Sequence, residues 1–309
     1  MFSLVVPIYN EEKLIDELLN RIVPAILSFT SDFELIFVDD GSTDNSLTAL
    51  RGWQQKEKRI KIISLSKNFG HQAAFTAGLE YSRGDIVGMM DGDLQDPPEI
   101  LAEMFRKITL EGYDIVSGRK TGRKGKSNRT FFSSLFHLFF RNMGEMKEMG
   151  NYGNFSMMTR NALSALLSLK EKVRYLPGMR TYVGFKQGEV EFVRDDRYEG
   201  RPKMSFLKLF RLASDAIFSF SKFPLRLCLV LGILGTIVFM AAGIYVVVAK
   251  IYGFAVIGWS STLLSIYFLG SIQLLFLGVL GEYIYRNYKE SQNRPVYFVK
   301  QYFDSPSEK

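Results

Sequence analysis

The chain has 309 residues, a formal net charge of +7 and 47% hydrophobic residues. This length accommodates one large catalytic domain and an accessory segment. The apolar residues are unevenly distributed, because residues 227–249 and residues 251–281 contain no charged side chain. Each run is longer than the roughly 20 residues that cross a hydrocarbon core. The pattern favours two transmembrane helices, within 227–249 and 260–282, over two buried helices of a soluble protein.

Basic residues flank both apolar runs and predict how the two helices are oriented. Five precede the first run: Lys203, Lys208, Arg211, Lys222 and Arg226. Four follow the second: Arg286, Lys289, Arg294 and Lys300. Only Lys250 lies between the runs, so the positive-inside rule places both ends in the cytoplasm. The same clustering favours anionic lipid or phosphate as partner over nucleic acid, which only the net charge supports.

The single cysteine and the N-terminus agree with a catalytic domain on the reducing side of a membrane. Cys228 lies inside the first apolar run, so no disulfide can form within the chain. The chain opens with Phe2 to Pro7, a strand-like segment, so we expect no signal peptide. The predicted location is the cell membrane, with the catalytic domain facing the cytoplasm.

The first 120 residues alternate between strand and helix patterns. Helical patterns cover Glu12–Leu27 and Thr43–Gln55. Five apolar, β-branched segments predict strands: Leu4–Ile8, Leu35–Val38, Ile60–Leu65, Ile86–Met90 and Ile115–Ser117. The alternation predicts an α/β domain with a mostly parallel sheet, whose ligands bind beyond the carboxyl ends of the strands. We expect a chain that lacks residues 224–309 still to bind nucleotide.

The segments between this region and the apolar runs have a different character. Residues 119–129 are basic and predict a loop, while Phe131–Phe140 and Met204–Phe223 resemble amphipathic helices in the headgroup layer. Packing on the sheet is the alternative for the first of these helices. The predicted domains are therefore a catalytic domain at 1–203, an interfacial helix at 204–223, a two-helix transmembrane hairpin at 224–285 and a cytoplasmic tail at 286–309, which we expect to be frayed from Pro295 to Lys309.

An acidic motif follows the predicted strand Ile86–Met90. Asp91 and Asp93 are spaced so that an extended backbone places both carboxylates on one side, and Gly92 between them permits close approach of another group. With the amide oxygen of Gln95 they form a set of hard oxygen ligands suited to Mg²⁺ or Mn²⁺, which also bind substrate phosphates. An acidic turn that caps the helix beginning at Pro98 is the structural alternative. His71 and His137 lack a second ligand nearby in sequence, and we assign them packing or surface roles.

Three motifs together resemble a known family. They are Val6–Glu12, Val38–Asp44 and Asp91–Glu99. The chain resembles family 2 glycosyltransferases of the GT-A (Rossmann-like) fold. With the C-terminal hairpin it is similar to polyprenyl-phosphate glycosyltransferases, including bactoprenol glucosyltransferases and dolichyl-phosphate mannose synthases. The resemblance spans essentially the whole chain.

The resemblance implies roles for individual residues. The nucleotide-sugar site would comprise Pro7, Tyr9, Glu11, Val38, Asp40, Lys67, Gln72, Asp91, Gly92, Asp93, Arg201 and Lys203. The metal would be held by Asp91, Asp93 and Gln95, and the acceptor phosphate by Arg119, Arg129 and Ser133. The catalytic residues would be Asp91, Asp93, Arg119 and Arg129.

The implied activity is a metal-dependent hexosyl transfer from a nucleotide sugar, with UDP-glucose as best choice, to undecaprenyl or another polyisoprenyl phosphate, with inversion. UDP-N-acetylhexosamine and GDP-mannose stay open as donors. Asn154 stands where many relatives have an aspartate, and an asparagine cannot act as a base. A phosphate acceptor, already ionised near neutral pH, needs no base. Asn154 therefore favours the lipid-phosphate interpretation.

Two other functions fit the sequence less well. A processive polysaccharide synthase would carry a Gln-X-X-Arg-Trp motif, but neither Trp53 nor Trp259 follows an arginine. A non-catalytic membrane scaffold would not need Asp91, Asp93 and Gln95, which are all present. Gly232, Gly235, Gly278 and Gly281 predict close helix packing within the hairpin or in a homo-oligomer.

Overall fold

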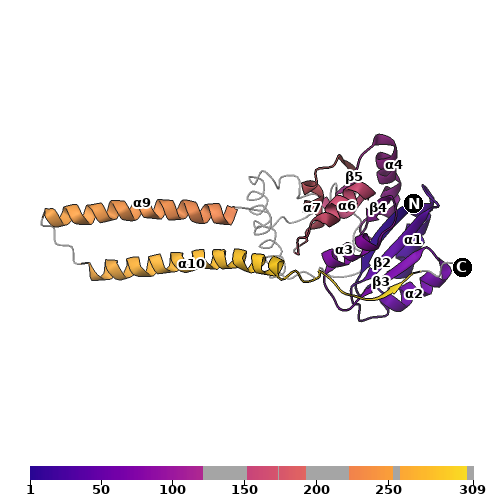
Figure 1. The fold of residues 1–309 in the computed structure, drawn as a ribbon, viewed down its shortest axis with the longest axis horizontal. Helices are drawn as coiled ribbons and strands as arrows, with labels where there is room; N and C mark the ends of the chain where they lie inside the picture. Colours follow the sequence, from indigo (N-terminus) through magenta and orange to yellow (C-terminus); the bar gives the residue numbers. More distant parts are fainter. Residues whose placement is uncertain (121–151, 173, 193–222, 253–257, 305–309) are drawn as a thin grey trace, which may run out of the picture. The chain divides into compact units, whose positions relative to one another are not determined.

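The computed structural model describes residues 1–120, 152–172, 174–192, 223–252 and 258–304. It divides the chain into two compact units (Figure 1). The first comprises residues 1–201 together with 295–309, and the second comprises residues 202–294. The chain therefore leaves the first unit, forms the second, and returns.

One sheet of eight strands organises the first unit, in the order β7-β5-β6-β4-β1-β2-β3-β8. Its parallel core consists of β1 Phe2–Ile8, β2 Phe33–Asp39, β3 Ile60–Leu65 and β4 Ile86–Met89. The remaining strands are β5 Ile115–Lys120, β6 Tyr152–Thr159, β7 Gln187–Phe192 and β8 Val299–Phe303. Strand β6 runs antiparallel to both β4 and β5, and β7 runs parallel to β5. The predicted α/β sheet is confirmed, as are all five predicted strands, to within a few residues at their ends.

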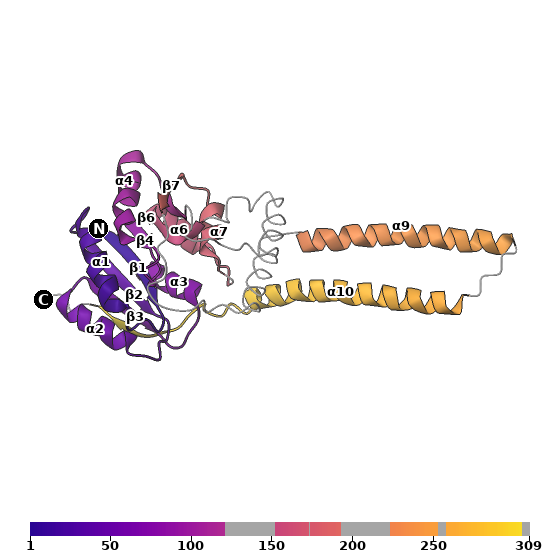
Figure 2. The same cartoon turned by 180° about the vertical axis from the view of Figure 1, so that it is seen from behind.

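Helices cover both faces of this sheet (Figure 2). One face carries α1 Ile15–Leu27, α2 Ser46–Lys56, the short 3-10 helix η1 Pro98–Ile100 and α4 Leu101–Glu111. The other carries α3 His71–Tyr81, α6 Arg160–Ser168 and α7 Leu176–Tyr182. Alternate residues of β1 supply the two cores: Leu4 and Val6 pack with α1, whereas Val5 packs with α3. Because both faces are covered, the parallel strands β1 to β4 are mostly apolar on both sides.

Helix α3 lies unusually close to the sheet. A Cβ atom at Gly78 would lie 2.9 Å from Cγ2 of Val38 and would also overlap Val5. A glycine is therefore needed where the helix crosses β1 and β2. This close packing fixes the position of His71 and Gln72, which begin α3 near the strand ends.

A buried polar network links β1, β2 and β3 near their N-terminal ends. The Ser3 hydroxyl donates to Oε1 of Glu34 at 2.6 Å, and Lys61 Nζ lies 2.8 Å from Oε2 of the same carboxylate. Burial opposes ionisation of Glu34, but the hydrogen bonds from Lys61, Ser3 and the amide of Arg83 together hold the pKa of Glu34 below its ordinary value. The network therefore contributes stability when Glu34 is ionised.

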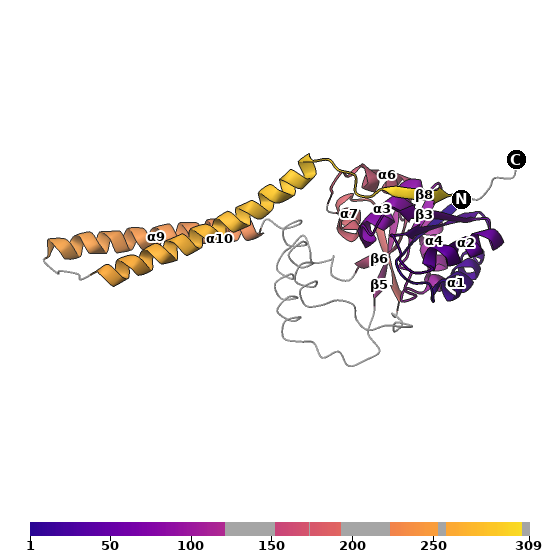
Figure 3. The ribbon, with the colours of Figure 1, turned by 90° about the horizontal axis from the view of Figure 1, so that it is seen from below.

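The C-terminal segment differs from the predicted frayed tail. Helix α10 continues to Ser291, and β8 then pairs antiparallel with β3 at the edge of the sheet (Figure 3). The side chain of Gln54 donates to the carbonyl of Phe303 at 2.9 Å, and the rings of Tyr302 and Tyr81 are 5.1 Å apart. A short, partly polar edge strand gives a weak pattern in sequence, and only its pairing with β3 defines it.

The second unit contains two long helices, α9 Phe223–Ile251 and α10 Trp259–Ser291. Their segments Cys228–Ala249 and Ser265–Ser291 are long and apolar enough to cross a membrane. Leu229 and Leu274 are 64% and 72% exposed, as expected of side chains whose surroundings are lipid. A Cβ atom at Gly232 would lie 3.8 Å from Phe276, so the two helices approach each other there.

Candidate active site

The loop after β1 is tied to the loop after β2. The amide of Asn10 donates to the Ser42 hydroxyl at 3.1 Å, and the amide of Glu11 donates to the Ser46 hydroxyl at 3.0 Å. Asn10 has a positive φ of 55°, a left-handed conformation that asparagine adopts more readily than most residues. Tyr9, before it, is 43% exposed. The predicted nucleotide residues at the end of β1 therefore belong to a loop held in place by its neighbour.

Asp40 connects β2 to the loop that follows β3. Its side chain is buried, with Oδ1 accepting from the Phe69 amide at 2.7 Å and Oδ2 accepting from the Gly70 amide at 2.9 Å. Burial raises the pKa of Asp40 above its ordinary value, although these two hydrogen bonds oppose the rise. Gly41 has a φ of 69°, and a Cβ atom there would lie 2.5 Å from the carbonyl carbon of Lys67. Asp40 thus orders the 66–70 loop, and direct contact with a nucleotide stays a prediction.

The acidic motif lies immediately after β4. Gly92 brings this loop against the end of β1, where a Cβ atom would lie 2.8 Å from the Pro7 carbonyl oxygen. The close approach that the sequence suggested for Gly92 is therefore made by the neighbouring strand end. Asp93 Oδ1 accepts a hydrogen bond from the backbone amide of Gln95 at 3.2 Å. Leu94 has a φ of 59°, a rare conformation for a branched residue. Backbone strain of this kind concentrates at functional sites.

His71 joins the site, which the sequence did not indicate. Its Nε2 lies 2.9 Å from Oδ1 of Asp91. Burial opposes protonation of His71, but the hydrogen bond and charge of Asp91, with Asp93 and Asp40 nearby, raise the pKa of His71 above its ordinary value. Its position at the start of α3, 20 residues before Asp91, hid the contact, because only the fold brings the two together.

Asp91, Asp93 and Gln95 are the candidate ligands of a divalent cation. In the part of the chain that the structure describes, no group of three His, Cys, Asp or Glu side chains comes together to hold a metal. Asp91 and Asp93 nevertheless supply two carboxylates from one loop, and Gln95 lies buried beside them. Mg²⁺ and Mn²⁺ commonly take only one or two protein carboxylates and complete their coordination with substrate phosphates and water. These residues therefore fit a cation that shares its ligands with a nucleotide diphosphate.

A polar cluster continues from α3 to β6 and α7. The Gln72 side chain donates from Nε2 to Asn154 Oδ1 at 3.1 Å, and its Oε1 accepts from the Leu176 amide at 3.0 Å. Both ends of this carboxamide therefore have protein partners. Lys67, the other predicted donor-side residue, lies with its Nζ 5.2 Å from the centre of the Phe69 ring. Its contact with a donor stays a prediction.

The acceptor side is only partly described. Arg119, at the exposed end of β5, has its Nη1 3.2 Å from Glu189 and 3.9 Å from Glu191, both on β7. Strand β6 separates β5 from β4, which carries the acidic motif. The other two predicted acceptor residues, Arg129 and Ser133, lie outside the described residues. The same holds for the predicted donor-side residues Arg201 and Lys203 and for the segments predicted as interfacial helices. The acceptor assignments thus stay predictions.

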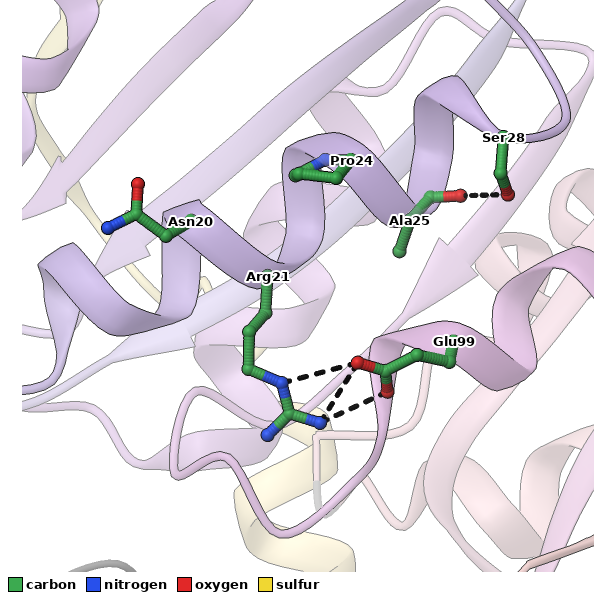
Figure 4. A pocket seen from close by; sticks show the side chains of 6 residues that line it. All are labelled: Asn20, Arg21, Pro24, Ala25, Ser28 and Glu99. Atoms are coloured by element: carbon green, nitrogen blue, oxygen red, sulfur yellow. Dashed lines mark hydrogen bonds and ion pairs between the residues drawn. The ribbon is translucent and has the colours of Figure 1, made fainter.

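A separate hollow of about 420 Å³ lies between α1 and η1 (Figure 4). Its lining residues are Asn20, Arg21, Pro24, Ala25, Ser28 and Glu99. Arg21 forms a bidentate ion pair with Glu99, whose nearest N–O distance is 3.0 Å. Glu99, the last residue of the acidic motif, therefore anchors η1 to α1 and takes no part in the site at the strand ends.

Comparison with known proteins gives the chain its family. Residues 3–167 match the model of the family described as "Glycosyl transferase family 2". The chain is 40% identical to an uncharacterized glycosyltransferase, YkcC, of Bacillus subtilis, over 97% of this chain and 93% of the relative. It is 34% identical to the bactoprenol glucosyl transferase of Shigella phage SfV, over 96% of this chain and 97% of that protein.

The solved structures that are similar to this chain include glucosyl-3-phosphoglycerate synthase from Mycobacterium tuberculosis, in complex with Mn²⁺, UDP-glucose and phosphoglyceric acid. It is 19% identical, with a TM-score of 0.49, over 71% of this chain and 77% of that structure. The family match covers the parallel core and the acidic motif, and the sequence similarity extends through the C-terminal helices. The chain belongs to glycosyl transferase family 2.

Proposed function

We propose that this enzyme transfers a hexose, with glucose from UDP-glucose as the best choice, to undecaprenyl or a related polyisoprenyl phosphate at the cytoplasmic face of the cell membrane. One observation carries the proposal. Proteins named bactoprenol glucosyl transferase are similar to this chain over 96% of its length, a span that includes the apolar helices as well as the catalytic unit. A soluble acceptor would give no reason for these helices to accompany the fold.

The donor side of the proposal rests on the strand ends. Asp40 holds the 66–70 loop through two backbone amides, and the Asn10–Ser42 contact holds the loop after β1. Together they preorganise a site at the carboxyl edge of the parallel strands, where ligands of such sheets bind. Asp91 and Asp93 would hold Mg²⁺ or Mn²⁺, which when bound stabilises negative charge on the departing nucleotide diphosphate.

The acceptor side follows from the chemistry of a lipid phosphate. With a second pKa of about 6, a phosphomonoester is largely ionised near neutral pH and is already a nucleophile. Asn154, which contacts Gln72 beside the acidic loop, cannot act as a base, and none is needed for this acceptor. Placement of the phosphate in line with the anomeric carbon gives direct displacement and inversion. Arg119, Arg129 and Ser133 are the proposed phosphate ligands.

The path of the chain supports the proposed topology. Residues before 202 and after 294 belong to one unit, so both ends of the helical hairpin connect to the same domain. Two crossings return the chain to the side from which it started. By the positive-inside rule, the basic residues at both outer ends of the hairpin favour the cytoplasm as that side. Among the described residues, an added Cβ at Gly235, Gly278 or Gly281 would meet no atom within 4 Å beyond its own stretch of helix, which is compatible with the predicted packing within the hairpin or between subunits.

The experiment combines the purified full chain with undecaprenyl phosphate and a panel of UDP-glucose, UDP-N-acetylhexosamines and GDP-mannose. We expect one glycolipid, identified by its mass, with the anomeric configuration inverted. Asp93→Ala should abolish transfer while the protein stays folded, since removing this half-buried carboxylate opens no apolar cavity. Glu103→Ala, an exposed acidic residue on α4, is the matched control and should transfer normally. Absence of any lipid-linked sugar, or near-normal turnover by Asp93→Ala, would refute the proposal.

A further inference from the structure

Arg180 on α7 is a buried arginine to which the sequence assigned no role. It is 1% exposed, and its guanidinium donates to the carbonyls of Gly153 at 2.5 Å and Asn154 at 3.0 Å and to the hydroxyl of Ser156. In the part of the chain that the structure describes, its buried Nε has no hydrogen-bond partner. Burial lowers the pKa of Arg180 to about 10, so the side chain stays charged at neutral pH. Among the described residues, no carboxylate pairs with it.

The strand register relates the position of this charge to the acidic loop after β4. Ser156 on β6 pairs with Met89, the last residue of β4. The same register continued by two residues sets Asn154 beside Asp91, and residues directly opposite each other share one face of a sheet. The contacts from α3 agree, since His71 reaches Asp91 and Gln72 reaches Asn154 on this face. The guanidinium of Arg180 therefore lies on the face of the sheet that α3 covers. From this face His71 and Gln72 contact Asp91 and Asn154.

Burying the charge of Arg180 costs free energy that a purely structural role does not require. A buried ion that has only carbonyl and hydroxyl partners loses more hydration energy than these dipoles return, and a neutral donor would hold the same carbonyls. In surroundings of low dielectric constant, however, a fixed positive charge acts strongly on nearby anions without reorganising. The cost becomes understandable when an anionic reactant binds close by.

We propose that Arg180 is a positioning residue, which shapes the start of β6 and places a permanent positive charge behind the site for the phosphate groups of the reaction. The inference rests on the proposed function and deepens it. The phosphates belong either to the nucleotide diphosphate or to the lipid phosphate. Both are anions that would bind near the end of β4.

The test uses the full chain with Arg180→Gln, which removes the charge, and Arg180→Lys, which retains it. Calorimetry measures the affinity for UDP and for uridine, and kinetics measures the turnover number and the Michaelis constant for undecaprenyl phosphate. If the charge serves the diphosphate, Arg180→Gln weakens UDP binding about tenfold or more and changes uridine binding less than about twofold. If it serves the lipid phosphate, the Michaelis constant for the lipid rises by a similar factor at unchanged UDP affinity. In either case Arg180→Lys, which retains the charge, keeps the affected quantity close to its value in the unmodified protein.

Arg160→Gln is the matched control. Arg160 donates from Nε to the carbonyl of Gly84 at 2.9 Å, near the opposite end of β4, so it also binds backbone but lies away from the phosphates. Its substitution should lower thermal stability without changing either phosphate readout. The inference is overturned if Arg180→Gln leaves both readouts within about twofold of the unmodified protein, or if Arg180→Lys is as defective as Arg180→Gln. Should Arg180→Gln not fold, a tenfold loss of both readouts in folded Arg180→Lys overturns it equally. Failure of the unmodified chain to bind any nucleotide would instead reject the proposed function.

Discussion

Removing β8 should damage the nucleotide site, although this strand lies at the far end of the chain. The perturbation is deletion of residues 295–309 with both long helices retained. The amide of Ser66 donates to the carbonyl of Phe298 at 2.9 Å, and the rings of Phe298 and Phe69 are 6.1 Å apart. Phe69 and Gly70 are the residues whose amides hold Asp40. The segment before β8 therefore supports the loop that organises the donor side.

The size of the effect can be worked from these contacts. The deletion removes four residue pairs between β8 and β3, which correspond to about one hydrogen bond each. It also removes the hydrogen bonds from Ser66 to Phe298, from Gln54 to Phe303 and from Tyr297 to Glu80. At about 0.5 kcal/mol net for each hydrogen bond, the loss is on the order of 3 kcal/mol. That is a large part of the roughly 5–15 kcal/mol that stabilises a domain, and in a domain of this size it lowers the melting temperature by roughly 6–12 °C.

Thermal unfolding and UDP calorimetry on detergent-purified protein provide the assay. We expect a lower melting temperature and a UDP affinity reduced by about tenfold, which corresponds to about 1.4 kcal/mol lost in ordering the 66–70 loop. Deletion of residues 305–309 alone, which keeps β8 whole, is the control and should behave as the full chain does. If removal of 295–309 leaves both quantities unchanged, the edge strand does not support the site and this reasoning fails.

Three further predictions test other parts of the molecule. Gly92→Ala should reduce turnover by about tenfold or more with the fold retained, measured by steady-state kinetics, since its Cβ would displace the acidic loop from the Pro7 carbonyl. Changing Arg119 and Arg129 together to glutamine should raise the Michaelis constant for lipid phosphate about tenfold to a hundredfold and leave UDP calorimetry unchanged; the opposite result would assign them to the donor. Because the pKa of Glu34 lies below its unfolded value of 4.5, the protein should lose stability as the pH falls below that value, and Glu34→Gln should flatten this dependence in acid unfolding curves.

The sequence by itself determined the features that depend on local pattern. The apolar, β-branched segments predicted the five strands from β1 to β5, and the spacing of Asp91 and Asp93 after one of them predicted a functional loop at a strand end. The two uncharged runs predicted α9 and α10. Each of these signals is contained in a short stretch of chain, because strand alternation, helix periodicity and the length of an apolar run are set by near neighbours.

Only the tertiary structure decided which distant segments meet. Strand β8 carries too weak a pattern to be distinguished from a tail, and its place is defined by β3, more than 230 residues earlier in the chain. The same holds for the contact of His71 with Asp91 and for the burial of Arg180 beneath β6. These contacts form because sheet register and helix packing bring together residues that no local pattern relates. An edge strand, a histidine and an arginine look ordinary in sequence, and long-range packing alone gives them their surroundings.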